Sequence, residues 1–310
     1  MNTDMVLILG TTASGKGPLA FELARAINGE IISVDSMKVY RRMDIGTAKP
    51  PRKARTRIKY HLIDVVEPSE SFSAGAFSDA ALAAIEDIKR RNRPVIAVGG
   101  TALYLKALLY GLFRGPGSDK QIRENLRARA QTEGLKELYS ELSKIDPDAA
   151  EHIHPNDSKR IIRALEVHML TGKPISKLQK QFSAEKTLHH WTLIGLDRDK
   201  TDVNSRINRR VKEMMAAGLL DEVQSLLAED KPLSTQARSA IGYAEMISCL
   251  NGQISLENAI ELIKKNTRRL AKNQRTWFKT FINVNWLDID AQEPPGRIFD
   301  RTMTLLNKIE

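Results

Sequence analysis

One seven-residue segment constrains the fold of this chain more than any other. Gly10–Lys16 has the sequence GTTASGK and stands between the apolar run Met5–Leu9 and a helical pattern at Pro18–Ile27. A buried strand, a glycine-rich turn and a helix in this order are typical of the phosphate loop of ATP-binding and other nucleotide-binding proteins. The glycines let backbone N–H groups turn inward, and the helix N-terminus and the lysine add positive charge. We therefore predict a phosphate-binding segment at Gly10, Thr11, Thr12, Ala13, Ser14, Gly15, Lys16 and Gly17.

Position 17 departs from this motif. A serine or threonine usually follows the lysine and holds a magnesium ion, but here the residue is Gly17. Either the metal is held through water and phosphate oxygens, or a nearby hydroxyl of Thr11, Thr12 or Ser14 takes its place. The sequence leaves both alternatives open and assigns no metal ligand.

The order of predicted strands and helices indicates an α/β fold. Strands alternate with helices, which favours a P-loop-type parallel sheet flanked by helices. The predicted strands are Met5–Leu9, Ile31–Val34, His61–Val65, Pro94–Val98 and Trp191–Leu196. The helices predicted around them are Pro18–Ile27, Gly75–Arg91, Ala102–Leu109, Asp202–Ala217, Leu219–Ala228, Ala240–Asn251, Ser255–Phe281 and Gly296–Lys308.

Between residues 118 and 190 the pattern changes to helices without a convincing strand. The helices predicted here are Gln121–Thr132, Leu135–Ile145, Pro147–Ile153 and Asp157–Thr171. We therefore expect an all-helical insertion domain at 118–190. The α/β core would then comprise 1–117 and 191–310.

Composition limits the cellular setting of the protein. The chain has 310 residues, of which 42% are hydrophobic, enough for a sizeable core. No run approaches the roughly 18 apolar residues of a membrane helix, and the first residues lack the basic segment of a signal peptide. The single cysteine, Cys249, excludes an internal disulfide and fits a reducing compartment. We expect a cytoplasmic monomer without membrane association.

The net charge of +10 is gathered in clusters, which suggests an anionic partner. The segments 51–59 and 262–279 carry five and seven basic residues without an acid. A third basic group, in the insertion, consists of Arg123, Lys159, Arg160 and Arg163. In the segment 262–279 the basic residues recur three or four apart and line one helical face: Lys264, Arg268, Lys272, Arg275 and Lys279. A nucleic-acid backbone is the natural partner of this face, and a merely solvated surface is the alternative.

Polar residues follow two predicted strands at the sheet edge where active sites of parallel sheets gather. Asp35 comes directly after the strand at Ile31–Val34. A carboxylate there can accept a proton or bind metal-bound water, and a helix N-cap is the alternative. Thr101 follows Gly99 and Gly100, which come directly after the strand ending at Val98. Its hydroxyl can meet a phosphate or a base, and it can also cap the helix that begins at Ala102. Asp64 matches a metal-binding acid only weakly and is interpreted as structural.

Together these segments resemble the tRNA dimethylallyltransferases, also called tRNA isopentenyltransferases, over nearly the whole chain. The most specific segment is Glu30–Pro50, EIISVDSMKVYRRMDIGTAKP. One residue departs from the family there, because Lys38 stands where glutamine is usual. The other matching segments are Gly10–Lys16, His61–Phe77, Val98–Leu112, His154–Pro174, Ala240–Met246 and Thr267–Phe278.

The resemblance implies transfer of a dimethylallyl group from dimethylallyl diphosphate to N6 of the adenosine 3′ to the anticodon in tRNA. Diphosphate leaves from the phosphate loop with its Lys16, and magnesium (Mg2+) assists. Asp35 is the implied base, and Thr101 lies beside it. The implied contacts to the anticodon stem-loop come from Asp35, Ser36, Met37, Lys38, Thr101, Arg123, Lys159, Arg160 and Arg163. The basic helical face adds Lys272 and Arg275 as expected tRNA contacts.

Three other functions are weighed against this one. A P-loop kinase would keep a hydroxyl at position 17 and would not need the basic helix. An isopentenyltransferase acting on free adenine nucleotides would generally be shorter and lack the insertion. An RNA-binding protein without catalysis would be consistent with the missing hydroxyl at Gly17. That function does not explain why Lys16, Asp35 and Thr101 all lie where catalysis would need them.

Overall fold

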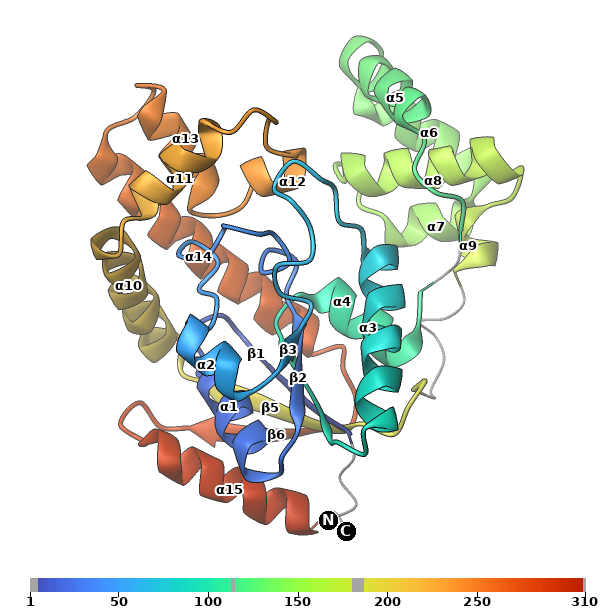
Figure 1. The fold of residues 1–310 in the computed structure, drawn as a ribbon. Helices are drawn as coiled ribbons and strands as arrows, with labels where there is room; N and C mark the ends of the chain where they lie inside the picture. The colour runs from blue at the N-terminus through green and yellow to red at the C-terminus, as the bar shows by residue number, and fades with distance from the viewer. Residues whose placement is uncertain (1–4, 113–114, 180–186, 309–310) are drawn as a thin grey trace. The chain divides into compact units, whose positions relative to one another are not determined.

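The computed structural model describes residues 5–112, 115–179 and 187–308 (Figure 1). The chain forms two compact units, of which the first comprises Met1–Leu109 with Leu188–Glu310 and the second Tyr110–Thr187. The insertion expected at 118–190 therefore starts and ends later in the chain than the second unit, and its residues 180–186 lie outside the described ones.

The first unit is built on a six-stranded sheet of order β3-β2-β4-β1-β5-β6, in which every neighbouring pair is parallel. Its strands are β1 (Met5–Gly10), β2 (Glu30–Val34), β3 (Tyr60–His61), β4 (Val95–Gly99), β5 (Thr192–Arg198) and β6 (Val284–Ile289). Every residue of β1 and β2 is buried, which is typical of a sheet with both faces covered. The predicted α/β class is confirmed.

Two strands differ from the prediction. The strand expected at His61–Val65 is wrong beyond His61, because Leu62 and Asp64 have left-handed φ angles of 62° and 57°, which a strand does not contain. The edge strand β6 was not predicted. It is buried mainly at alternate residues near its end, so its sequence lacks the long apolar run of the central strands.

Helices cover the sheet (Figure 1). Side chains of α1 and α15 form one hydrophobic cluster with β1, β2, β4, β5 and β6, and α3 and α14 also contact the sheet. The helices of this unit are α1 (Lys16–Ala26), α2 (Arg52–Arg57), α3 (Ala74–Arg90), α4 (Ala102–Tyr110), α10 (Lys200–Ala216), α11 (Leu219–Leu227), α12 (Thr235–Arg238), α13 (Tyr243–Leu250), α14 (Leu256–Phe278) and α15 (Pro295–Lys308). The short helices α2 and α12 were not predicted.

A second hydrophobic cluster lies beside the phosphate loop. It joins α10, α11, α13 and α14 to Ala13 of the loop and to Val39, Tyr40 and Met43, which follow β2. The C-terminal helices therefore support both the loop and the segment after β2, although they are far from both in the sequence.

The second unit is a helical bundle with its own core, built around Leu138, Leu142, Ile161 and Leu165. Its helices are α5 (Lys120–Thr132), α6 (Leu135–Ile145), α7 (Pro147–His152), α8 (Ser158–Thr171) and α9 (Ile175–Leu178). Aspartate side chains cap α5, α7 and α8, which explains their sharp starts. Across the described chain, no helix is both long and apolar enough to cross a bilayer.

Candidate active site

The phosphate loop is held by side chains that bind its carbonyl oxygens. Arg198 Nε, at the end of β5, donates to the carbonyl oxygen of Ser14 at 2.8 Å. Arg206 Nε, on α10, donates to that of Ala13 at 2.7 Å. Asp202 anchors Arg198 in turn, with 2.9 Å between Nη1 and Oδ2. These two hydrogen bonds hold the backbone of the loop from outside, through its carbonyl oxygens.

A buried glutamine ties the phosphate loop to the glycine turn after β4. Gln274, on α14, accepts a hydrogen bond from the Thr12 N–H at 2.8 Å through Oε1. Its Nε2 donates to the carbonyl oxygen of Gly100 at 2.9 Å. A Cβ on Gly100 would lie 2.4 Å from this Nε2, so only glycine allows the approach. One amide side chain thus fixes the distance between two turns of the sheet edge.

The segment after β2 is folded into a tight turn by its own side chains. Asp35 Oδ1 accepts hydrogen bonds from the N–H groups of Met37 and Lys38, at 2.9 and 3.3 Å. The N–H of Ser36 donates to the Thr101 hydroxyl at 3.1 Å, which joins this turn to the one after β4. The helix-cap alternative for Asp35 is wrong, because no helix begins between Ser36 and the start of α2 at Arg52.

A glutamate from α11 holds the next part of this segment. Glu222 accepts hydrogen bonds from the N–H groups of Asp44, Ile45 and Gly46, at 3.0, 2.8 and 3.3 Å. The Tyr243 hydroxyl donates to the same carboxylate at 2.5 Å. This carboxylate gathers several donors that would otherwise be unpaired, so it positions the loop that borders the cavity.

Asp64 belongs to a partly buried ion-pair group. Its carboxylate contacts Lys49 Nζ and Arg55 Nη1, each at 2.5 Å. Lys49 is almost fully buried and also binds Asp44, at 2.7 Å. The contacts agree with the structural interpretation of Asp64.

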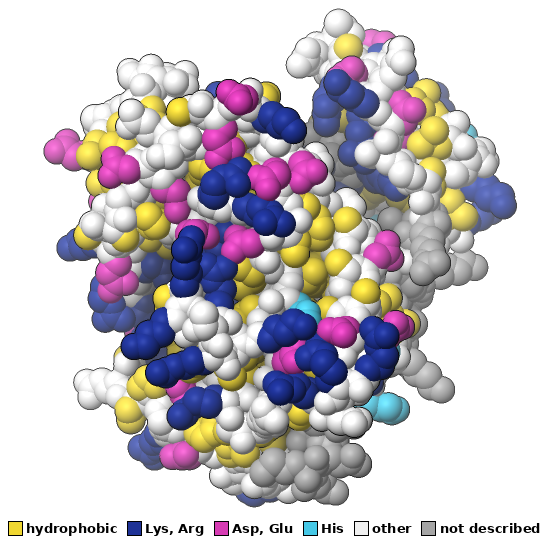
Figure 2. All heavy atoms as spheres, viewed as in Figure 1, with side chains coloured by type: hydrophobic (Ala, Val, Ile, Leu, Met, Phe, Trp, Pro, Cys, Tyr) yellow, Lys and Arg dark blue, Asp and Glu magenta, His cyan; other side chains and the backbone are white. Residues whose placement is uncertain are grey.

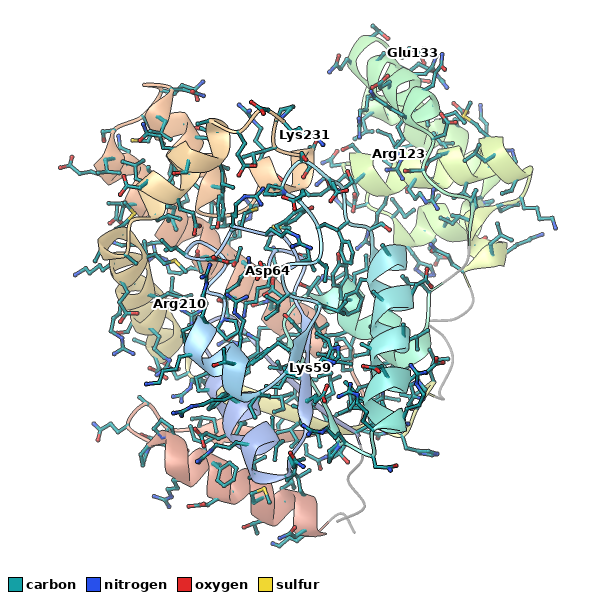
Figure 3. The ribbon with its side chains drawn as sticks, viewed as in Figure 1. Lys59, Asp64, Arg123, Glu133, Arg210 and Lys231 are labelled. Atoms are coloured by element: carbon teal, nitrogen blue, oxygen red, sulfur yellow. The ribbon has the colours of Figure 1, made fainter. Side chains whose placement is uncertain are left out.

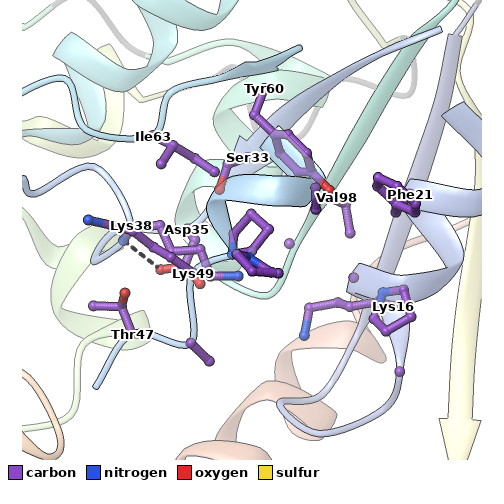
Figure 4. A pocket seen from close by; sticks show the side chains of 18 of the residues that line it. Lys16, Phe21, Ser33, Asp35, Lys38, Thr47, Lys49, Tyr60, Ile63 and Val98 are labelled. Carbon is purple, nitrogen blue, oxygen red and sulfur yellow. Dashed lines mark hydrogen bonds between the residues drawn. The ribbon is translucent and has the colours of Figure 1, made fainter. Parts of the chain in front are cut away.

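Two cavities meet at Asp35. The first, of about 390 Å³, is lined by phosphate-loop residues, Lys38 and the segment 47–51 (Figure 4). The second, of about 350 Å³, is lined by Ser36, Met37 and apolar side chains of α10 and α14. The two share Thr12, Asp35, Thr47, Ala48 and Arg210. Within the described chain nothing donates to Asp35 Oδ2, so this oxygen is available to a substrate.

The first cavity is strongly cationic. Burial, and after it the charges of Lys38 and Arg210, lower the pKa of Lys16 from 10.5 to about 7. The Lys16 ammonium donates to the Thr11 carbonyl oxygen at 2.9 Å. Arg210, which Figure 3 places on α10, lies with Nη1 3.3 Å from the Thr12 hydroxyl oxygen. An anion of two or more charges would relieve this repulsion.

The phosphate loop lacks the hydroxyl that usually holds a magnesium ion in this motif. Gly17 has no hydroxyl, and the Thr12 hydroxyl already contacts Arg210. Among the described residues, no three carboxylate, histidine or cysteine side chains gather where they could hold a metal. Magnesium usually requires oxygen ligands and keeps several waters. We therefore derive no chemical step from the metal.

The basic residues of the second unit divide into two kinds. Arg123 and Arg163 bind the fully buried Glu166, at 2.8 and 2.6 Å, so both guanidinium groups stabilise the bundle (Figure 3 labels Arg123). Lys159 and Arg160 are exposed on α8, and only Arg160 has an ion-pair partner, Asp157 at 3.3 Å, among the described residues. The second pair is the freer one to meet a polyanion.

The basic face expected on α14 is only partly exposed. Arg268 donates to Asn208 of α10 at 2.8 Å, and Arg275 donates to the carbonyl oxygen of Arg198 at 3.1 Å. Lys272 and Lys279 are exposed. The predicted basic face is therefore engaged inside the protein at Arg268 and Arg275. Their spacing reflects internal hydrogen bonds as well as surface charge.

Basic residues of the segment 51–59 form ion pairs with acidic residues that are distant in the sequence. Arg55 pairs with Asp64, and Lys59 lies 3.6 Å from Asp87. Figure 2 shows basic side chains interspersed with acidic ones on one face of the molecule. A cluster without acids in the sequence is thus a mixed surface in the fold.

Five residues that shape the site were missed by sequence reasoning. They are Arg198, Arg206, Arg210, Glu222 and Gln274. The sequence contains a weak signal for three of them, namely Arg206, Arg210 and Gln274. Arg206 and Arg210 lie one helical turn apart, and Gln274 interrupts the buried face of α14 between Ala271 and Phe278. Nothing in the sequence indicates that Glu222 binds the backbone near residue 45.

A phosphate loop after β1 of a parallel sheet, with a carboxylate at the end of β2, which lies beyond β4 in the same sheet, defines an α/β protein of the P-loop type. A family model described as IPP transferase matches residues 38–281. The chain belongs to this family, as its resemblance to the tRNA dimethylallyltransferases predicted. This identification is confirmed by similarity to curated and solved relatives.

A tRNA dimethylallyltransferase of Geobacter metallireducens is 45% identical over 97% of this chain and 96% of its own. One from Acetivibrio thermocellus is 44% identical over 95% of each chain. The crystal structure of a tRNA isopentenylpyrophosphate transferase from Bacillus halodurans has a TM-score of 0.70, 40% identity, and coverage of 99% and 98%. A eukaryotic dimethylallyltransferase acting on tRNA has a TM-score of 0.81, 30% identity, and coverage of 98% of this chain and 79% of its own.

The lowered pKa of Lys16 predicts that binding of an anion such as pyrophosphate at this cavity depends on pH. Below a pH of about 7 the ammonium is charged before binding, whereas above it the amine must take up a proton when the anion arrives. We expect the affinity for inorganic pyrophosphate to fall as pH rises from about 7 to 9. Calorimetry at pH 8 in buffers of different ionisation enthalpy should report proton uptake, after correction for the pyrophosphate's own titration. Lys16→Gln should remove that uptake, and equal uptake by this variant would contradict the assignment.

Proposed function

We propose that the protein transfers a dimethylallyl group from dimethylallyl diphosphate to N6 of the adenosine 3′-adjacent to the anticodon in tRNA, and releases diphosphate. The observation that carries this proposal is the position of Asp35, which is shared by the cationic cavity and the second cavity. Two substrates that enter from the two cavities would meet at this carboxylate. Membership of the family supplies the identity of the transferred group and of the RNA.

The phosphate loop binds the leaving group in this reaction. When the bond between the prenyl carbon and the diphosphate oxygen breaks, the electron pair stays on the diphosphate, whose negative charge grows. The loop N–H groups, Lys16 and Arg210 are arranged to stabilise that charge where it develops. Because the Arg and Gln side chains behind the loop hold it in place, little reorganisation accompanies the step.

Asp35 accepts the proton that the adenine N6 must lose as its new bond to carbon forms. Its Oδ1 is used by the turn, and Oδ2 faces no donor within the described residues. Thr101, which accepts from the Ser36 N–H, keeps the carboxylate's turn in place. The target base has to leave its stack to reach this position, so a fixed turn at Asp35–Lys38 serves as its binding strip.

The RNA is bound by basic surfaces outside the cavity. Lys159 and Arg160 of the second unit and Lys272 of α14 present exposed charge to the anticodon stem-loop. Arg123, Arg163 and Arg275 add partly exposed guanidinium groups that also hold the fold. Magnesium remains a prediction from the resemblance, as do a monomeric state and a cytoplasmic location.

The transfer itself is tested with radiolabelled dimethylallyl diphosphate and tRNA. Label should enter the tRNA with the unaltered protein, and we expect Asp35→Asn to reduce the rate by about 100-fold or more, since a general base contributes on that order. Asparagine keeps an oxygen for the Met37 N–H, so the turn should persist. Binding of pyrophosphate and tRNA should change little. A rate within about threefold of the unaltered protein would refute the role of Asp35.

The second unit offers a matched test of RNA binding. Lys159 and Arg160 follow Asp157, just as the exposed Lys89 and Arg90 follow Asp87 on α3. Replacing Lys159 and Arg160 with alanine should weaken tRNA binding and flatten the plot of log affinity against log salt by up to about two units, because each lost phosphate contact releases roughly one counterion fewer. The same change at Lys89 and Arg90 serves as the control. Equal slopes for both double variants would mean that Lys159 and Arg160 do not contact tRNA.

A further inference from the structure

The cavity above the phosphate loop contains more positive than negative charge. The charged side chains that line it are Lys16, Lys38, Lys49, Arg210, Glu22 and Asp35. Lys49 is neutralised by Asp44 and Asp64, and Glu22 is paired with Arg25 at 2.6 Å. Three cations and one carboxylate remain without such partners: Lys16, Lys38, Arg210 and Asp35. The cavity is therefore built for an anion that carries more than one charge.

Lys38 is the least satisfied of these cations. Within the described part of the chain, no hydrogen bond or ion pair engages its ammonium. Burial lowers the pKa of Lys38, and its charge is the second cause, after burial, of the lowered pKa of Lys16. The two ammonium groups are thus close enough to repel each other. A desolvated ammonium without a partner is costly, and a bound phosphate group would supply that partner (Figure 4 shows both lysines at the cavity).

Packing does not explain the glycine at position 17. A Cβ added to Gly17 would meet no atom within 4 Å, and its backbone is not in the left-handed region. The Cβ of a serine or threonine would therefore fit there without a clash. Lack of room for a side chain at position 17 therefore does not explain why the hydroxyl that holds magnesium in other phosphate loops is missing. The cavity that lacks this hydroxyl is also lined by the cation Lys38.

We propose that Lys38 is a diphosphate-binding residue. In other phosphate loops a magnesium ion held by the hydroxyl supplies positive charge to the phosphates, and here the Lys38 ammonium supplies part of that charge. The proposal rests on the proposed function, since it takes an isoprenoid diphosphate as the natural occupant of the cavity. Lys16 and Arg210 would bind the same anion from the side of the loop. The site then binds diphosphate without a metal ligand from the protein.

The test is calorimetric titration of the whole chain with inorganic pyrophosphate, in EDTA and in magnesium, at constant pH and ionic strength. The unaltered protein should bind in EDTA. Lys38→Gln should weaken this binding about 10- to 100-fold, the usual range for loss of a charge-assisted hydrogen bond. Lys38→Arg, which keeps the charge, should restore most of it. Lys53→Gln removes one exposed lysine outside the cavity and is the matched control.

A second variant tests the missing hydroxyl. Gly17→Thr should increase pyrophosphate affinity in magnesium and leave it nearly unchanged in EDTA, because the new ligand acts only through the ion. Thermal melts first show that the unaltered protein and Lys38→Gln are both folded at the assay temperature. Equal pyrophosphate affinities of the two proteins in EDTA would then overturn the proposal. The proposal would also be overturned if the unaltered protein bound pyrophosphate in magnesium but not in EDTA. These results are independent of prenyl transfer, whose failure would overturn the proposed function while pyrophosphate binding could still follow Lys38.

Discussion

The site depends on the way its phosphate loop is held from outside. Arg198 and Arg206 bind the loop's carbonyl oxygens, and Gln274 binds the Thr12 N–H together with the turn after β4. These side chains come from β5, α10 and α14, which lie far along the chain. A short glycine-rich loop cannot keep its shape from local forces alone, because glycine loses the most conformational freedom when it is ordered. The C-terminal helices therefore act as the scaffold of an N-terminal loop.

The same support explains why two cavities meet at one carboxylate. With the loop and the turn after β4 joined by Gln274, and the turn after β2 joined to Thr101, the three strand ends form one continuous edge. Asp35 lies where the cationic cavity and the more apolar cavity share their walls. This arrangement separates the binding of an anion from the binding of a base and brings both to one proton acceptor. Lys38 extends the cationic side of the same turn.

The sequence predicted the parallel sheet, the phosphate loop, most helices and the family, because each depends on local patterns or on a specific motif. It failed where a residue's role is set by a distant partner. The spacing predicts Arg275 on a basic face, but it does not indicate that the same side chain also binds the carbonyl oxygen of Arg198. The strand at His61–Val65 ends early because Leu62 and Asp64 adopt left-handed conformations. Glu222 could not have been identified, since only the fold brings it to the backbone at Asp44–Gly46.

The central claim is that the phosphate loop holds a leaving diphosphate and not a nucleotide whose terminal phosphate is transferred. It is tested by offering the protein tRNA, dimethylallyl diphosphate and ATP labelled in the γ-phosphate, followed by mass analysis of the nucleosides and assay of the released phosphates. The account predicts one diphosphate released for each N6-dimethylallyl adenosine formed, with the γ-label remaining on ATP. Transfer of the γ-label to any acceptor, without prenylated adenosine, would contradict it.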